Sequence, residues 1–112
     1  MQIYARRLVR VGHESRRKIV TREKIETTAT ILNQKGLHAR ASAKFVATVA
    51  RYQAEVTVTK GDNVVSGRSI MGLMMLGASK GSMIGLSAEG VDADGVIRAL
   101  LDLIQAKFHE DA

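Results

Sequence analysis

The residues best suited to chemistry are a histidine and an arginine two positions apart, His38 and Arg40, in the stretch GLHAR at residues 36–40. This stretch follows a β-like run and precedes a helix-like run, so both side chains should lie where a helix begins. Free backbone N–H groups and the positive end of the helix dipole favour an anion there. Imidazole is a good nucleophile near neutral pH, and the guanidinium fork suits phosphate. The pair therefore predicts an acceptor for a phosphoryl group.

The neighbouring residues fit the same hypothesis. Gly36 permits a tight turn, Leu37 can anchor the loop in the core, and the small side chain of Ala39 leaves the helix amides accessible. A second interpretation stays open, because a surface histidine near a helix cap is usually incidental and a single arginine is usually solvated. Only the combination of both residues with this loop favours the phosphoryl acceptor.

Other catalytic classes lack their residues. The chain has no cysteine, and its three histidines are too far apart to suggest a metal site by spacing. The sequence has neither a phosphate-binding loop of the form GxxxxGK[ST] nor a GxSxG nucleophile motif. We therefore expect no metal or cofactor, and a carrier of a phosphoryl group rather than a stand-alone enzyme.

Positive charge is concentrated at the N-terminus. The net charge is +6, and residues 1–25 hold eight basic and two acidic side chains, so the rest of the chain is balanced. Few large apolar residues and no sustained period predict a basic, weakly ordered extension over residues 1–25, followed by one domain over residues 26–112. A rival hypothesis is a nucleic-acid module that uses this arm. The neutral domain, with no aromatic residue on its expected strands, argues against it.

Seven elements are expected to position the site. Strands are predicted over residues 26–33, over a hairpin at 54–68, and over 82–90; helices are predicted over 39–52, after a cap at Ser69, and after a cap at Asp92. The first helix has small apolar residues on one face (Ala39, Ala43, Val46, Ala47, Ala50), and the last has an apolar stripe (Val96, Ile97, Leu100, Leu101, Ile104, Phe108). The order β-α-β-β-α-β-α predicts an α+β fold with a four-stranded antiparallel sheet and three helices on one face.

Features of a membrane or exported protein are missing from the sequence. No apolar run approaches the roughly 20 residues of a membrane helix. The N-terminus has no apolar signal region with a small-residue cleavage site. We therefore expect a cytoplasmic protein without membrane insertion.

Two stretches carry a family resemblance. KGLHARASAKFV closely resembles the active-site segment of the HPr family, the histidine-containing phosphocarriers of the bacterial phosphoenolpyruvate-dependent phosphotransferase system. GRSIMGLMMLGASKGSMIGLSAEG resembles the second signature of the family, and the predicted element order is that of its open-faced β-sandwich. The resemblance covers roughly residues 26–110. One departure is Ala41, where the family commonly has proline; because alanine forms helix well, we expect it to be tolerated with a slightly looser site.

The resemblance implies a relay. Members accept a phosphoryl group from phosphorylated enzyme I and pass it to an enzyme IIA, so His38 would be the acceptor and Arg40 would stabilise the phosphate. We expect a monomer, and both sugar uptake and the nitrogen-related branch stay open as the pathway that it serves. The alternative is a regulatory protein of the nitrogen branch, which binds sensor enzymes according to its phosphorylation state.

The second stretch has two interpretations as well. The apolar residues of this helix (Ile70, Met71, Met74 and Met75) could be core residues, yet four apolar side chains on so short a helix exceed what one buried face needs. We expect Ile70 and Met71 to dock partners, and Met74 or Leu76 to pack inward. Ser69 is explained by helix capping alone, but its counterpart in many relatives is phosphorylated by HPr kinase/phosphorylase, so it is also a candidate regulatory site.

Overall fold

The computed structural model describes residues 4–11 and 20–112. Its elements are β1 (Tyr4–Val11), β2 (Val20–Thr30), α1 (Ala39–Val49), β3 (Glu55–Lys60), β4 (Asn63–Ser66), α2 (Ile70–Met75), β5 (Met83–Gly90), α3 (Ala93–Gln105) and a short 3₁₀ turn at Lys107–His109. Each element predicted from residue 26 onward is present. The first strand ends at Thr30 rather than near Asn33, and α1 ends at Val49, three residues before Tyr52.

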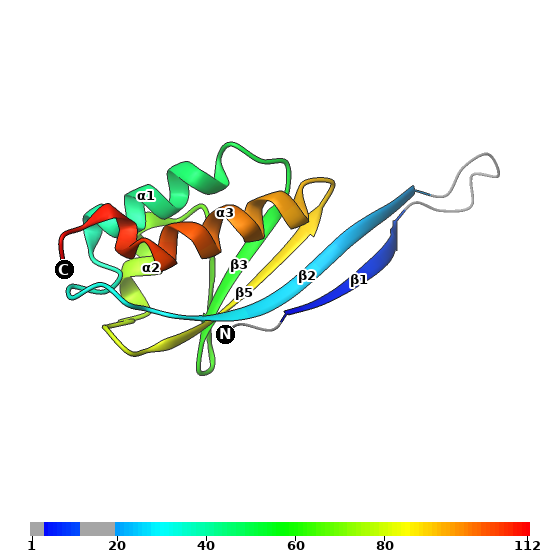
Figure 1. The fold of residues 1–112 in the computed structure, drawn as a ribbon. Helices are drawn as coiled ribbons and strands as arrows, with labels where there is room; N and C mark the ends of the chain where they lie inside the picture. Colours follow the sequence, from blue (N-terminus) through cyan, green and yellow to red (C-terminus); the bar gives the residue numbers. More distant parts are fainter. Residues whose placement is uncertain (1–3, 12–19) are drawn as a thin grey trace.

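One antiparallel sheet forms the base of the molecule, with strand order β1-β2-β5-β3-β4. The three helices lie on one face of this sheet, and the other face is open (Figure 1). The part β2-β5-β3-β4 is the predicted four-stranded sheet, so the α+β open-faced sandwich is confirmed. Along β3 and β5, buried residues alternate with more exposed ones, as expected for a sheet covered on one side.

The fifth strand differs from the sequence expectation. Tyr4 to Val11 pair with β2 in a regular antiparallel register, from Tyr4 opposite Thr27 to Val11 opposite Val20, within a segment expected to be weakly ordered. The unpaired N–H and C=O groups along the edge of β2 provide the partners for β1, and composition alone does not reveal such an edge. Residues 20–25 of the predicted extension belong to β2, and its remaining residues, 1–3 and 12–19, lie outside the described residues.

The face that α1 buries is opposite to its alanine stripe. Its fully or nearly buried residues are Ala41, Ser42, Phe45, Thr48 and Val49. Ala39, Ala43, Ala47 and Ala50 are exposed, and Val46 is partly buried. Both faces have helical spacing, but Phe45 is much larger than any alanine and gains more free energy from burial. The small residues therefore form an outer surface of the helix.

The apolar stripe of α3 is confirmed, and so is the position of its predicted cap, but the capping hydrogen bond is not formed. Val96, Ile97, Leu100 and Ile104 are at most 1% exposed and pack with Phe45 of α1 in one core. Asp92 occupies the N-cap position, yet its side chain makes no capping bond. Its Oδ2 instead accepts a hydrogen bond of 2.7 Å from the backbone N–H of Gln53 and so ties the end of the α1–β3 connection to α3.

In the described part of the chain, every helix is too short or too polar to span a lipid bilayer.

Candidate functional site

The loop before α1 is fixed by its contact with the segment after α2. Gly36 has a φ of +66°, and a Cβ atom there would lie 2.3 Å from the carbonyl oxygen of Ala78. The backbone N–H of Leu37 donates a 2.9 Å hydrogen bond to that same oxygen, and the Leu37 side chain is 4% exposed. Only glycine fits this turn without strain. The predicted roles of Gly36 and Leu37 are therefore confirmed, and the loop brings His38 to the N-cap of α1.

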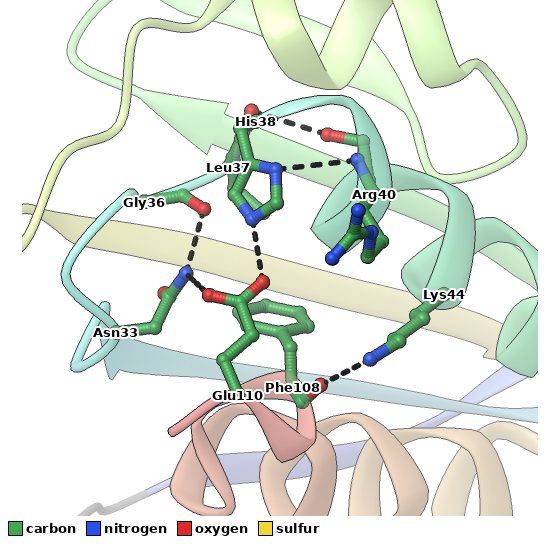
Figure 2. Close-up of polar contacts among 9 residues, drawn as sticks. Asn33, Gly36, Leu37, His38, Arg40, Lys44, Phe108 and Glu110 are labelled. Atoms are coloured by element: carbon green, nitrogen blue, oxygen red, sulfur yellow. Dashed lines mark hydrogen bonds and ion pairs between the residues drawn. The ribbon is translucent and has the colours of Figure 1, made fainter. Parts of the chain in front are cut away.

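Both ring nitrogens of His38 have partners (Figure 2). Nδ1 lies 3.3 Å from the backbone N–H of Arg40, and Nε2 lies 2.5 Å from Oε2 of Glu110. A backbone N–H can only donate and a carboxylate can only accept, so these partners assign the ring proton to Nε2. The lone pair of Nδ1 then faces the first amides of the helix, where an incoming phosphoryl group would also find hydrogen-bond donors.

Glu110 is the site residue that sequence reasoning missed. It lies 72 positions after His38, just beyond the turn that follows α3. Its other oxygen, Oε1, accepts a 2.9 Å hydrogen bond from Nδ2 of Asn33, which also donates to the carbonyl of Gly36 at 2.9 Å. Asn33 is fully buried and was interpreted only as the end of a strand. No spacing in the sequence relates these residues, because only the fold brings the two ends of the domain together.

The environment of Glu110 favours its charged form. Partial burial raises the pKa of Glu110. The hydrogen bonds from Asn33 and His38 lower it, electrostatic attraction to the His38 ring and the Lys44 ammonium lowers it as well, and together these effects outweigh burial. The pKa of this carboxyl therefore lies below its ordinary value of 4.5, so Glu110 is a carboxylate at neutral pH.

Arg40 lies in the same cleft as His38, as predicted from their spacing. The cleft has a volume of about 430 Å³ and is lined from the loop, α1 and the C-terminal residues by Gln34, Lys35, His38, Arg40, Lys44, His109, Glu110, Asp111 and Ala112. Arg40 is exposed, and Lys44 donates a 2.6 Å hydrogen bond from Nζ to the carbonyl oxygen of Phe108. Three cationic side chains thus surround the histidine, which suits an anionic group.

The second predicted site lies at the start of α2. Oγ of Ser69 accepts a 2.9 Å hydrogen bond from the backbone N–H of Gly72, so the predicted cap is confirmed. Met71 is 69% exposed, while Ile70 and Met74 are 42% and 43% exposed. Leu76 packs inward rather than Met74. Met75, which the sequence did not single out as a docking residue, is 79% exposed. Because α2 packs beside α1, this apolar surface borders the helix that His38 begins.

A model of one protein family matches most of the chain. Its description is "PTS HPr component phosphorylation site", and it matches residues 25–106. The chain belongs to the HPr family. This chain is therefore one of the phosphocarrier proteins of the phosphotransferase system, and the family resemblance of its two motifs is confirmed. The match ends before Glu110 and begins after β1.

Individual relatives support the same family assignment. The chain is 50% identical to the phosphocarrier protein HPr of Neisseria meningitidis over 86 residues, which are 77% of this chain and 97% of that protein. It is 40% identical to the phosphocarrier protein NPr of Shewanella violacea, over 78% of this chain and 96% of that protein. Among solved structures, HPr-C-His from Thermoanaerobacter tengcongensis is similar, with a TM-score of 0.74 and 46% identity over 78% of this chain and 98% of that one.

Proposed function

We propose that this phosphocarrier accepts a phosphoryl group on Nδ1 of His38 from phosphorylated enzyme I and passes it to an enzyme IIA in the cytoplasm. The observation that carries the proposal is the position of His38. Its Nδ1 faces the N–H groups that begin α1, while its Nε2 proton is held by Glu110. A neutral imidazole with this proton arrangement has its nucleophilic lone pair on Nδ1.

The transfer is a displacement at phosphorus. The lone pair of Nδ1 forms the new N–P bond while the bond between phosphorus and the donor breaks and leaves its electron pair on the donor. Phosphate oxygens can then accept hydrogen bonds from the first amides of α1 and from the guanidinium of Arg40. Transfer to enzyme IIA reverses these roles, with His38 as the leaving group.

The exposed residues of α2 support a docking role. Ile70, Met71 and Met74 offer exposed apolar side chains on α2, which packs beside α1. Methionine side chains adapt to partners of different shape, which suits a carrier that binds both a donor and an acceptor. A phosphate on Ser69 from HPr kinase/phosphorylase would lie beside this surface and weaken docking, so we propose Ser69 as a negative regulatory site on a protein that acts as a monomer.

A second candidate function is the regulatory nitrogen branch. The 40% identity to a Shewanella violacea protein named NPr favours this candidate, whereas the 50% identity to a Neisseria meningitidis protein named HPr favours the first one. Both candidates use the same histidine chemistry and differ in the partner proteins. Comparing phosphoryl transfer to enzymes IIA of the sugar and nitrogen branches separates them, because the correct branch should transfer much faster.

We also propose that residues 26–112 form the carrier domain and that β1 is an addition to it. A chain without residues 1–19 loses β1 and keeps β2. Its phosphorylation on His38 should equal that of the full chain, because the cleft is lined by residues between Gln34 and Lys44 and between His109 and Ala112, outside β1. Loss of phosphorylation in this shortened chain would contradict the division of the chain into a carrier domain and an added strand.

The decisive experiment uses purified enzyme I and phosphoenolpyruvate. Intact mass should increase by one phosphoryl group, and the modification should be lost in acid and survive base, as expected for a phosphoramidate. The His38→Ala variant should acquire nothing. An acid-labile phosphate on that variant would contradict the proposal.

A further inference from the structure

The last six residues fold back over the histidine loop. We call residues 107–112 the C-terminal strap. Its first three residues, Lys107, Phe108 and His109, have φ angles of 55°, 55° and 61°. L-amino acids rarely adopt this left-handed conformation, and three consecutive non-glycine residues in it persist only when the surroundings enforce it.

Three contacts enforce the path of the strap. The Phe108 side chain is fully buried in the core. Its carbonyl oxygen accepts the 2.6 Å hydrogen bond from Lys44, one helical turn after Arg40. At the end of the strap, the carbonyl of Ala112 accepts a 3.1 Å hydrogen bond from the backbone N–H of Gln34 in the histidine loop. These contacts place the carboxylate of Glu110, 15% exposed, against Nε2 of His38.

Asn33 fixes the carboxylate from the other side. Its amide directs Nδ2 to Gly36 and to Glu110, and among the described residues its Oδ1 is the buried side-chain atom without a hydrogen-bond partner. An unpaired buried carbonyl is destabilising, so stability alone does not explain this arrangement. The arrangement does hold Glu110 at both oxygens, with Asn33 on Oε1 and His38 on Oε2.

We infer that Glu110 is a positioning residue of the phosphoryl transfer, acting through His38. Its carboxylate keeps the ring proton on Nε2 and leaves Nδ1 free to attack. When Nδ1 forms its bond to phosphorus, the ring becomes positively charged, and the carboxylate stabilises that charge. Carboxylates play the same role beside catalytic and metal-bound histidines in unrelated proteins. The inference rests on the proposed function and adds a residue outside the matched family segment.

Other charged groups share the cleft and could imitate this effect. Lys35, Arg40 and Lys44 face it from the loop and α1, and His109 and Asp111 face it from the strap. Asp111 is exposed, and no described hydrogen bond or ion pair joins it to His38. It is therefore a matched control, because Asp111→Asn removes one carboxylate from the strap without touching the ring.

The experiment measures His38 reactivity without a protein donor. Phosphoramidate transfers its phosphoryl group to histidine with release of ammonia, so docking does not enter the rate. We compare wild type, Glu110→Gln and Asp111→Asn by ³¹P NMR at pH 7, and determine the ring tautomer of each from ¹⁵N chemical shifts. Glu110→Gln should be phosphorylated about 10- to 100-fold more slowly, the range for residues that orient a functional histidine. It should also contain more of the tautomer protonated at Nδ1, since the glutamine amide can donate to Nε2.

The results distinguish a positioning role of Glu110 from a structural contact. Asp111→Asn should match wild type in rate and tautomer, and all three proteins should melt within a few degrees of one another. If wild type and Glu110→Gln react equally fast with the same tautomer, Glu110 is a structural contact and the inference is overturned, while the proposed function stands. If wild-type His38 accepts phosphate from neither phosphoramidate nor enzyme I, the proposed function itself fails.

Discussion

α1 and α2 both begin at N-cap residues whose side chains accept a hydrogen bond from the helix backbone, and the two caps differ in what explains them. At α2, Oγ of Ser69 accepts a 2.9 Å hydrogen bond from Gly72, and nothing else is needed to account for a serine there. At α1, Nδ1 of His38 makes a longer contact of 3.3 Å, in a cleft with three cationic side chains and a carboxylate on its other nitrogen. Because His38 caps the helix poorly but has many polar neighbours, its chemistry explains its presence better than capping does.

Among the variants that test this comparison of the two caps, Arg40→Ala should have the largest effect on the rate of phosphorylation. Removing the guanidinium takes away a charged donor to the phosphate in the transition state, so the rate of phosphorylation by enzyme I should fall roughly 100-fold. Because Arg40 is exposed, the melting temperature should hardly change. Arg51→Ala, at the exposed far end of the same helix region, is the control and should react like wild type. Equal loss in both variants would mean that general positive charge, rather than Arg40, assists the transfer.

Ser69→Asp tests whether the second cap is also a regulatory site. A carboxylate at the start of α2 is favourable to the helix dipole, so the fold should persist. The same charge lies beside Ile70 and Met71, where it should weaken docking of enzyme I about tenfold, equivalent to about 1.4 kcal/mol. Stopped-flow or quench kinetics should find the defect in KM rather than kcat. Kinetics identical to wild type would leave Ser69 as a helix cap alone.

Ser69→Ala separates capping from charge. It removes the hydroxyl that accepts from Gly72, so we expect a loss of about 1 kcal/mol in the free energy of unfolding. Phosphorylation of His38 should stay at the wild-type rate, because no charge enters the docking surface. Urea unfolding combined with the enzyme I assay checks both. A slower transfer by this variant would show that the order of α2 itself, and not charge, controls the site.

The carboxylate of Glu110, which contacts the His38 cap and has no counterpart at Ser69 among the described residues, should make a smaller contribution to stability that depends on pH. The folded-state pKa of Glu110 is lowered, so its contribution to stability is present above the unfolded pKa near 4.5 and is lost as the pH falls through the lower folded value. Wild type should therefore lose its stability advantage over Glu110→Gln as the pH falls below about 4.5. Thermal melts of both proteins from pH 7 to pH 3 measure this. A constant difference across that range would contradict an ionised Glu110 in the folded protein.

Local features of the fold and site were predictable, and features created by distant contacts were not. Gly36 has a positive φ, and His38 and Ser69 accept hydrogen bonds from backbone N–H groups two or three residues away, so turn and cap chemistry identified these positions. Glu110 reaches His38 across 72 residues, and no local pattern records that contact. The face of α1 was ambiguous for a similar reason, since two sets of residues share the helical period and only packing against the rest of the core chooses between them. The pairing of β1 likewise depends on an edge that exists only once β2 is placed.

The central claim is that Nδ1 of His38 carries the phosphoryl group. The most direct test is to phosphorylate ¹⁵N-labelled protein with enzyme I and phosphoenolpyruvate and to measure ¹⁵N–³¹P coupling within the histidine ring. The account predicts coupling at Nδ1 of His38, with the Nε2 proton retained. Coupling at Nε2, or a phosphate on His13, His109 or a serine, would contradict it.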